Sequence, residues 1–262
     1  MNEKILALIP ARMGSSRFPG KPLAPILEMP MIGHVYERVR RCKILTETVV
    51  CTCDEEIYQY IESLGGKAVM TSSQHERASD RCAEALIFLE ETQNCNYDIV
   101  VMVQGDEPMT HPDMITESVQ PMLDDPTLLV TNLLGRINGI TEFENHNCIK
   151  VVCDMQNNAL YFSREPIPTR FKSSEIPIGK QVCIIPFRRD FLLEYTQMSP
   201  TPLEIAESID MLRILEHGMN VRLVPTEFDT YAVDTEEDRQ IVEKLLLKDS
   251  VTSLYCDFSQ IT

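Results

Sequence analysis

The sequence lacks the features of membrane and nucleic-acid-binding proteins. No apolar run approaches the length of about 18 residues that a membrane-spanning helix needs. Residues 1–4 (Met-Asn-Glu-Lys) do not resemble the start of a secretory signal peptide. Lys and Arg number 24 against 40 Asp and Glu, and a net charge of −16 leaves no basic face for nonspecific nucleic-acid binding. We therefore expect a cytoplasmic protein that binds neither membrane nor nucleic acid.

Several common site motifs are also missing. The nine cysteines form no Cys-x-x-Cys pair, and the five histidines show no zinc-type spacing with them. An odd number of unpatterned cysteines favours reduced thiols in a reducing compartment. Neither the Gly-x-x-x-x-Gly-Lys-Ser/Thr loop nor the Gly-x-Gly-x-x-Gly fingerprint occurs. The two commonest nucleotide-binding loops are thus excluded.

A cluster of cations follows the first apolar run of this acidic chain. Residues 5–9 (Ile-Leu-Ala-Leu-Ile) predict a buried strand, and Arg12, Arg17 and Lys21 come next, among small residues. Such a loop can turn N–H groups toward an anion, while Arg forks and the Lys charge neutralise phosphates. A solvated basic loop is the alternative, although α/β folds bind nucleotides after the first strand. The predicted triphosphate-binding residues are Ala11, Arg12, Gly14, Ser15, Ser16, Arg17 and Lys21.

The first half of the chain alternates between strand-like and helix-like segments. Strands that are separated by helices favour right-handed crossovers and a mainly parallel sheet. The expected fold class is therefore α/β, with a Rossmann-like, mainly parallel sheet. The predicted strands are 4–10, 47–53, 67–71 and 98–104, and the predicted helices are 30–42, 54–64, 79–92 and 112–123.

The second half has longer irregular links and a more antiparallel character. The predicted strands are 127–137, 148–154, 158–163, 180–188 and 220–225, and the predicted helices are 202–217 and 235–247. We expect a nucleotide-binding half at 1–126 and a substrate-binding half at 127–262. One continuous domain is the alternative.

Two carboxylates are candidate metal ligands. Asp106 lies in residues 104–108 (Gln-Gly-Asp-Glu-Pro), directly after a predicted buried strand, where α/β folds place the ligand crevice. A nucleoside triphosphate arrives with Mg²⁺, which takes one or two protein carboxylates. The alternative is an ordinary Asp-capped turn. Asp234 is the second candidate, although its surroundings favour a helix N-cap.

Five blocks of the sequence together resemble the 3-deoxy-manno-octulosonate (Kdo) cytidylyltransferases. They occur in the family's order and extend over nearly the whole chain. The resemblance implies a nucleotidyltransferase fold, a homodimer and a part in lipopolysaccharide biosynthesis. It also implies that CTP and an acidic sugar react to give a CMP-sugar acid and pyrophosphate. The blocks are residues 9–23, 104–108, 150–152, 159–168 and 233–238.

The resemblance also implies roles for individual residues. Asp106 and Asp234 would bind Mg²⁺, and Gln104 would lie beside the reacting centre, near both substrates. Thr71 and Ser72 would line the cytosine side of the nucleotide. Arg77 departs from the family pattern, and we expect it to give the nucleotide a new anion contact; an exposed charge at a helix entry is the alternative. The implied catalytic residues are Arg12, Arg17, Lys21 and Asp106, and the implied acceptor-binding residues are Gln104, Arg164, Gln181, Glu207 and Asp210.

Some positions depart from the family pattern, mostly on the acceptor side. The family's His-Gln-Ser-Gly-Thr-Asp/Glu-Arg is His-Glu-Arg-Ala-Ser-Asp-Arg at 75–81, and changes also fall at 181–185 and 210–213. A polar pocket built for one hydroxyl pattern penalises a mismatch strongly. The sequence therefore predicts CMP transfer to Kdo or a Kdo-like ulosonate. The alternatives are another acidic acceptor, such as a different ulosonate or a phosphonate, and a nucleotide-binding paralogue without turnover.

Overall fold

The computed structural model describes residues 3–14, 18–170, 172 and 179–256. The chain forms two compact units, one of Met1–Thr116 with Thr230–Thr262 and one of Glu117–Asp229. The segment that carries Asp234 thus belongs with the N-terminal unit. The predicted division into functional halves at residues 1–126 and 127–262 stays a prediction. Within the described ranges, no helix is both long enough and apolar enough to span a membrane.

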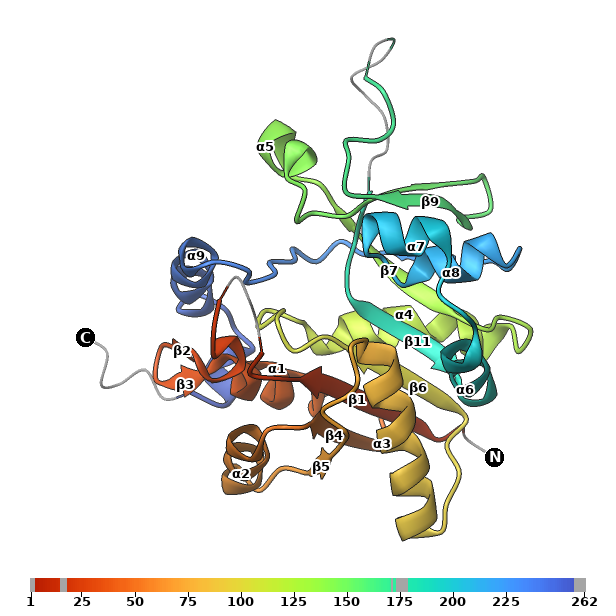
Figure 1. Cartoon of the computed structure of the whole chain (residues 1–262). Coiled ribbons are helices and arrows are strands. Elements are labelled where there is room, and N and C mark those ends of the chain that lie inside the picture. The colour runs from red at the N-terminus through yellow and green to blue at the C-terminus, as the bar shows by residue number, and fades with distance from the viewer. Residues whose placement is uncertain (1–2, 15–17, 171, 173–178, 257–262) are drawn as a thin grey trace. The chain divides into compact units, whose positions relative to one another are not determined.

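The first unit contains the predicted parallel sheet (Figure 1). The four strands of the sheet that belong to this unit run in the order β6-β1-β4-β5, and the three pairs that they form are parallel. β1 and β6 are buried along almost their whole length, as strands covered on both faces must be, which explains their unbroken apolar sequences. The strands are β1 (Ile5–Ala11), β4 (Glu47–Thr52), β5 (Ala68–Met70) and β6 (Ile99–Val103).

Helices cover this sheet and supply its crossovers. α1 and α2 follow successive strands in one direction across the sheet, whereas α3 leads back to the other side of β1. α9 packs on the short β2–β3 ribbon through a buried apolar cluster of Ile26, Met31, Val233, Val242 and Leu246. The elements are η1 (Lys21–Leu23), β2 (Pro25–Ile26), β3 (Met29–Pro30), α1 (Met31–Val39), α2 (Glu55–Ser63), α3 (Ala78–Gln93), α9 (Glu236–Leu246) and η2 (Thr252–Leu254).

The strand order reverses between β1 and β6. The chain moves from β1 to β4 and β5, and then returns to pair β6 with the opposite side of β1. In an open parallel sheet, the loops after the two strands at such a point diverge and leave a crevice for a ligand. The loops that begin at Arg12 and Gln104 therefore flank the expected binding position.

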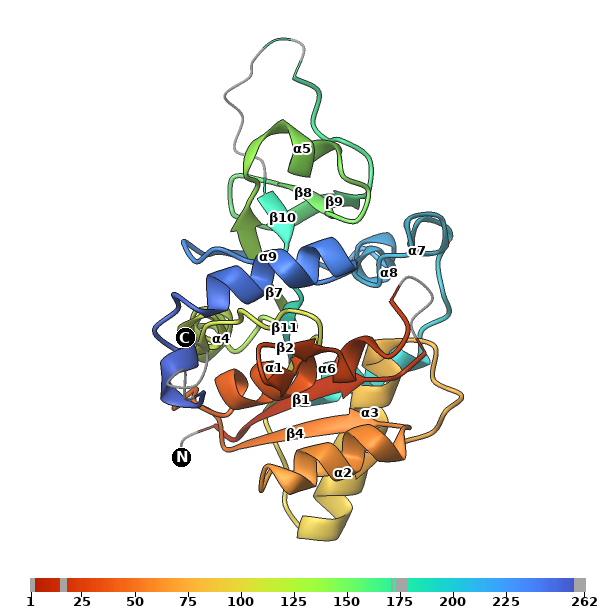
Figure 2. The same cartoon turned by 90° about the vertical axis from the view of Figure 1, so that its left-hand side faces the viewer.

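The second unit is mainly antiparallel, as the sequence predicts (Figure 2). Its sheet has the order β12-β7-β10-β8-β9, in which only the β12–β7 pair is parallel. The strands of this sheet are β7 (Thr131–Arg136), β8 (Lys150–Cys153), β9 (Ala159–Ser163), β10 (Gly179–Gln181) and β12 (Arg222–Pro225), and the unit also contains β11 (Ile184–Arg188), which is not part of this sheet. The helices are α4 (Pro112–Asp124, beginning in the first unit), α5 (Gly139–Glu144), α6 (Arg189–Gln197), α7 (Pro202–Glu207) and α8 (Met211–Glu216).

Two predicted elements are interrupted in the structure. The predicted strand 180–188 is split into β10 and β11, because Ile184 N–H donates to the carbonyl of Val182 instead of to a neighbouring strand. The predicted helix 202–217 is also wrong as a single element. Ser208 adopts a left-handed conformation with φ +54°, which ends α7 before α8 begins. A Ser at such a position gives no glycine signal, so the sequence did not mark the break.

Candidate nucleotide and metal site

Lys21 joins the two candidate metal ligands. Its Nζ lies 2.9 Å from Asp106 Oδ2 and 3.1 Å from Asp234 Oδ1. The side chains of Lys21, Asp106 and Asp234 are only 12%, 26% and 16% exposed. Three of the predicted site residues, distant in sequence, are thus brought within hydrogen-bond distance inside the first unit.

The local backbone explains the position of Lys21. Gly20 has φ +72°, a conformation that side-chain-bearing residues rarely adopt, and it turns the chain into the 3₁₀ helix that begins at Lys21. The carbonyl of Met13 accepts a 3.4 Å hydrogen bond from Gly20 N–H, which closes the intervening loop. Lys21 is therefore placed by the turn at Gly20.

Asp106 is held at the end of β6 by close packing. A Cβ atom on Gly105 would lie 3.0 Å from Ile32 Cδ1 and 3.2 Å from the carbonyl oxygen of Pro10. Glycine therefore allows the loop after β6 to approach the end of β1. The carbonyl of Asp106 also accepts a 2.9 Å hydrogen bond from Val233 N–H, so the loop is fixed to the segment before Asp234.

Thr235, not Asp234, caps helix α9. Thr235 Oγ1 accepts from Asp238 N–H at 3.2 Å, and Asp238 Oδ2 accepts from Thr235 N–H at 2.9 Å, which is a capping box. The predicted N-cap role of Asp234 is therefore wrong by one residue. Because Thr235 satisfies the helix end, the Asp234 carboxylate can point toward Lys21 instead.

The charges at this position are coupled. Burial disfavours the charged ammonium group, but Asp106 and Asp234 outweigh that effect and raise the pKa of Lys21 above its ordinary value. Two partly buried carboxylates facing one point would repel each other without a cation between them. Lys21 supplies that cation.

The donor set suits a hard divalent cation. Asp106 and Asp234 each direct a carboxylate oxygen at Lys21 Nζ, so a metal ion held by the same two oxygens would require the ammonium group to move, for example to a substrate phosphate. Mg²⁺ typically binds one or two carboxylates together with substrate phosphates. Among residues 3–14, 18–170, 172 and 179–256, no group of three or more His, Cys, Asp or Glu side chains could hold a metal. The remaining ligands would have to come from the nucleotide and from water.

The start of the predicted phosphate loop is anchored by Asp54, a residue that was not among the predicted site residues. Asp54 Oδ2 accepts from Met13 N–H at 2.8 Å, and its side chain makes no capping hydrogen bond to α2. Ala11 is the buried last residue of β1, and Arg12 and Gly14 are exposed. Ser15, Ser16 and Arg17 lie outside the described residues. The position of Asp54 directly after β4 could have indicated this role.

The predicted base-side residues lie after β5. Thr71 Oγ1 donates to the Thr52 carbonyl at 3.1 Å and also accepts from buried Arg81. Ser72 N–H donates to Glu84 Oε2 at 2.8 Å. Arg77 occupies the N-cap position of α3, at the far end of the same loop. Arg81 and Glu84 of α3, which were not predicted, thus hold the side chain of Thr71 and the backbone of Ser72. Gln104 is half-buried directly after β6.

In the second unit, two predicted acceptor residues lie together. Glu207 Oε2 accepts from Arg164 N–H at 2.8 Å, and Arg164 Nε donates to the Glu207 carbonyl at 2.7 Å. Ser163 Oγ donates to Glu207 Oε1 at 2.7 Å. Burial opposes the charge of Glu207, but the hydrogen bonds from Arg164 and Ser163 outweigh it and lower the pKa of Glu207.

The other two acceptor residues that were predicted in the second unit have different surroundings. Gln181, on β10, donates from Nε2 to Asn132 Oδ1 at 2.7 Å. Asp210 precedes α8 as its N-cap residue, and its carbonyl accepts from Tyr195 OH at 3.0 Å. The second unit therefore brings Arg164 and Glu207 into contact, while Gln181 is held by another strand.

Comparison with known proteins gives a consistent result. A family model described as cytidylyltransferase matches residues 6–221. The chain is similar to the 3-deoxy-manno-octulosonate cytidylyltransferase of Geobacter metallireducens, with 41% identity over 92% of this chain and 98% of the relative. It is similar to the enzyme of the same name from Syntrophus aciditrophicus, with 42% identity over 94% and 98%. Among solved structures, it resembles a CMP:2-keto-3-deoxy-manno-octonic acid synthetase complexed with CTP. That match has a TM-score of 0.85 and 38% identity, over 94% of this chain and 99% of the other.

Proposed function

Because the chain belongs to the 3-deoxy-manno-octulosonate cytidylyltransferase family, we propose that it transfers CMP from CTP to Kdo and releases pyrophosphate. In this reaction the anomeric hydroxyl of the sugar acid attacks the α-phosphorus of CTP. A new oxygen–phosphorus bond forms as the bond to the pyrophosphate leaving group breaks, and the hydroxyl proton is lost. The comparisons do not favour a different acceptor or a protein without turnover.

The observation that carries the proposal is the convergence of Lys21, Asp106 and Asp234. Phosphoryl transfer demands little covalent chemistry from a protein, so catalysis depends on positioning and on charge stabilisation. Lys21 lies at the end of the phosphate loop, where its ammonium group can contact the triphosphate. Arg12, which is exposed directly after β1, would add a forked donor, and we propose the same for Arg17.

A divalent cation, which we propose is Mg²⁺, would be held by Asp106 and Asp234. When bound, such a cation neutralises phosphate charge and stabilises charge that develops on the oxygens around phosphorus. The chain's own part is to keep both carboxylates directed at one point. It does so through the loop packing at Gly105 and through the cap at Thr235.

We also propose roles for the other predicted site residues. Thr71, Ser72, Arg77 and Gln104 would contact the nucleotide, and Gln104 would also face the acceptor. The acceptor's carboxylate and hydroxyl groups would be bound by Arg164, Gln181, Glu207 and Asp210. We further propose that the protein is cytoplasmic and that it forms a homodimer. Light scattering coupled to gel filtration would test the homodimer.

The direct test is pyrophosphate release from CTP and Mg²⁺ in the presence and absence of Kdo. We expect release that depends on Kdo, and the product should be CMP-Kdo by mass spectrometry. If the protein binds CTP but releases no pyrophosphate, with or without Kdo, the chain does not transfer CMP to this sugar.

A further inference from the structure

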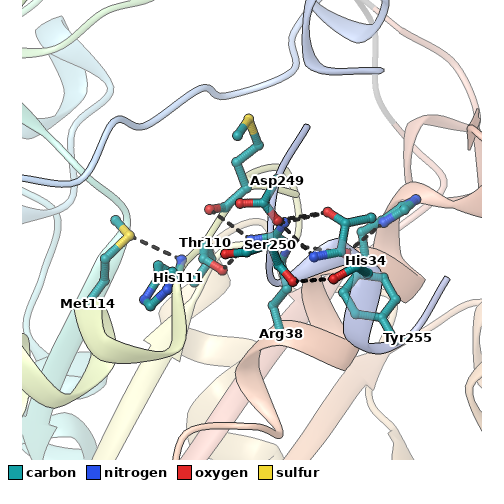
Figure 3. Close-up of polar contacts among 11 residues, drawn as sticks. His34, Arg38, Thr110, His111, Met114, Asp249, Ser250 and Tyr255 are labelled. Atoms are coloured by element: carbon teal, nitrogen blue, oxygen red, sulfur yellow. Dashed lines mark hydrogen bonds and ion pairs between the residues drawn. The ribbon is translucent and has the colours of Figure 1, made fainter. Parts of the chain in front are cut away.

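The C-terminal segment after α9 is fastened to helix α1 by one buried arginine. Arg38 is 0% exposed, and a charged group can be buried at tolerable cost only when it is paired and hydrogen-bonded. Its Nε donates to Tyr255 OH at 3.1 Å, and one terminal nitrogen donates to Thr252 Oγ1 at 2.8 Å and pairs with Asp249 (Figure 3). These three partners all lie between residues 249 and 255.

The other terminal nitrogen of Arg38 faces the loop after β6. It donates to the carbonyl oxygens of Met109 and Thr110, at 3.4 Å each (Figure 3). Both N–H and Oγ1 of Thr110 donate to the carbonyl of Glu107, at 3.0 and 2.9 Å. This tight turn begins at the residue after Asp106. Arg38 therefore uses its five donors on two segments, one leading from Asp106 and one leading from α9.

A neutral histidine completes this connection. His34 Nε2 lies 2.9 Å from the carbonyl of Ile26, so that nitrogen carries the proton, and Nδ1 accepts from Tyr255 OH at 2.9 Å. The hydroxyl of Tyr255 then accepts from Arg38. Ile26 belongs to the apolar cluster on which α9 packs. The 249–255 segment is thus fixed on the same elements that support α9.

We propose that Arg38 is a positioning residue for the Asp106–Asp234 carboxylate pair. α9 begins two residues after Asp234 and leads to Asp249, so Arg38 fixes the far end of this helix against the loop that carries Asp106. At the near end, the Val233–Asp106 hydrogen bond makes the second connection. Two connections, one at each end of α9, fix both the position and the direction of the helix. This inference rests on the proposed function, because it assigns metal binding to the two carboxylates.

The test measures metal binding without turnover. Mn²⁺ binding would be followed by electron paramagnetic resonance with CTP present and no acceptor, for the whole protein and for Arg38→Lys. Lys keeps the charge but cannot reach both segments with a fork. We expect the half-saturating Mn²⁺ concentration to rise about tenfold, as is typical when support for metal ligands is lost. Thr252→Val, which removes one bond to Arg38, should give a smaller rise in the same direction.

The matched control is Arg213→Lys. Arg213 is also a buried arginine with a forked partner, Glu204 at 2.7 and 2.6 Å, but it belongs to the second unit. The Arg213→Lys substitution should lower the melting temperature without changing Mn²⁺ binding. If Arg38→Lys lowers the melting temperature and leaves Mn²⁺ binding at the original value, Arg38 is only structural and the inference is wrong. If the unaltered protein binds no Mn²⁺ with CTP, the proposed metal function itself fails.

Discussion

The backbone N–H of Val233 donates to the carbonyl of Asp106 over 2.9 Å. This bond joins the loop after β6 to the last segment before α9, and each segment contributes one of the two carboxylates that contact Lys21. A hydrogen bond between backbones does not depend on side-chain rotamers. The main chain therefore joins the two segments directly, and substitutions of the two carboxylates themselves should affect chemistry more than folding.

Asp106→Asn should lower the rate of CMP transfer by about 100-fold or more, because it removes a charge on which the cation and Lys21 depend. The melting temperature should change by only a few degrees, since the side chain is partly exposed and the amide can still accept from Lys21. Steady-state pyrophosphate release and thermal unfolding would measure the two effects.

Asp113→Asn is the control for that experiment. Asp113 lies seven residues further along the chain, its side chain is 71% exposed, and it has no proposed role. Its substitution should leave the rate unchanged. A rate for Asp106→Asn equal to that of Asp113→Asn would contradict the assignment of Asp106.

Asp54→Ala should raise the KM for CTP with little change in kcat. The carboxylate of Asp54 holds Met13 N–H, so its loss frees the start of the phosphate loop before the substrate binds. One hydrogen bond contributes about 1 kcal/mol, which corresponds to a rise in KM of roughly five- to tenfold. Asp54→Asn keeps an acceptor oxygen and should have the smaller effect. Equal KM values for all three proteins would show that Asp54 does not order this loop.

Stability should fall below neutral pH because of His34. Burial is the largest cause that lowers the pKa of His34 to about 4, from 6.5 for an exposed histidine. Between these values the unfolded chain binds a proton that the folded chain does not, so stability rises with pH. The contribution of His34 is complete above pH 6.5 and is lost as the pH falls toward 4. From pH 7 to 5 the loss should be about 2 kcal/mol.

His34→Gln separates this effect from the titration of carboxylates. An amide can donate to the Ile26 carbonyl and accept from Tyr255 OH, but it does not titrate. Urea unfolding at pH 7, 6 and 5 should therefore show a shallower loss of stability in the variant. Parallel pH dependence in the two proteins would mean that His34 protonates without disturbing the fold.

The sequence predicted the first unit better than the second, for physical reasons. Residues 5–9 and 99–103 are unbroken apolar runs, which identify buried parallel strands, and the crossover rule then places the loops after them together. Ser208 ends α7 in a left-handed conformation that no local sequence signal marks. Helix periodicity continues across it, so 202–217 was predicted as one helix.

The same contrast applies to the candidate site. The sequence favoured Asp106 as a metal ligand because it follows a buried strand. It favoured Asp234 as a metal ligand only through the family resemblance, since the local sequence around Asp234 predicts a helix cap. Arg38 gave no signal, because an Arg on an amphipathic helix is usually solvated. Its role depends on residues near 110 and 250, and only the three-dimensional structure brings those segments to it.

Glu207→Gln should raise the KM for the acceptor and leave the KM for CTP unchanged. The Glu207 carboxylate receives hydrogen bonds from Arg164 N–H on one oxygen and from Ser163 Oγ and Tyr161 OH on the other. An amide in its place would direct its N–H groups either at Arg164 N–H or at the two hydroxyls, which would have to accept instead of donate, and it would lose the charge. The end of β9 would shift, and with it the Arg164 side chain that we propose binds the acceptor's carboxylate. We expect the KM for the acceptor to rise roughly tenfold, because one charge-assisted hydrogen bond is lost. Glu165→Gln serves as the control, because the side chain of Glu165 is 70% exposed. An increase in the KM for CTP of the same size would place Glu207 outside the acceptor site, because a residue that contacts only the acceptor side cannot weaken nucleotide binding equally.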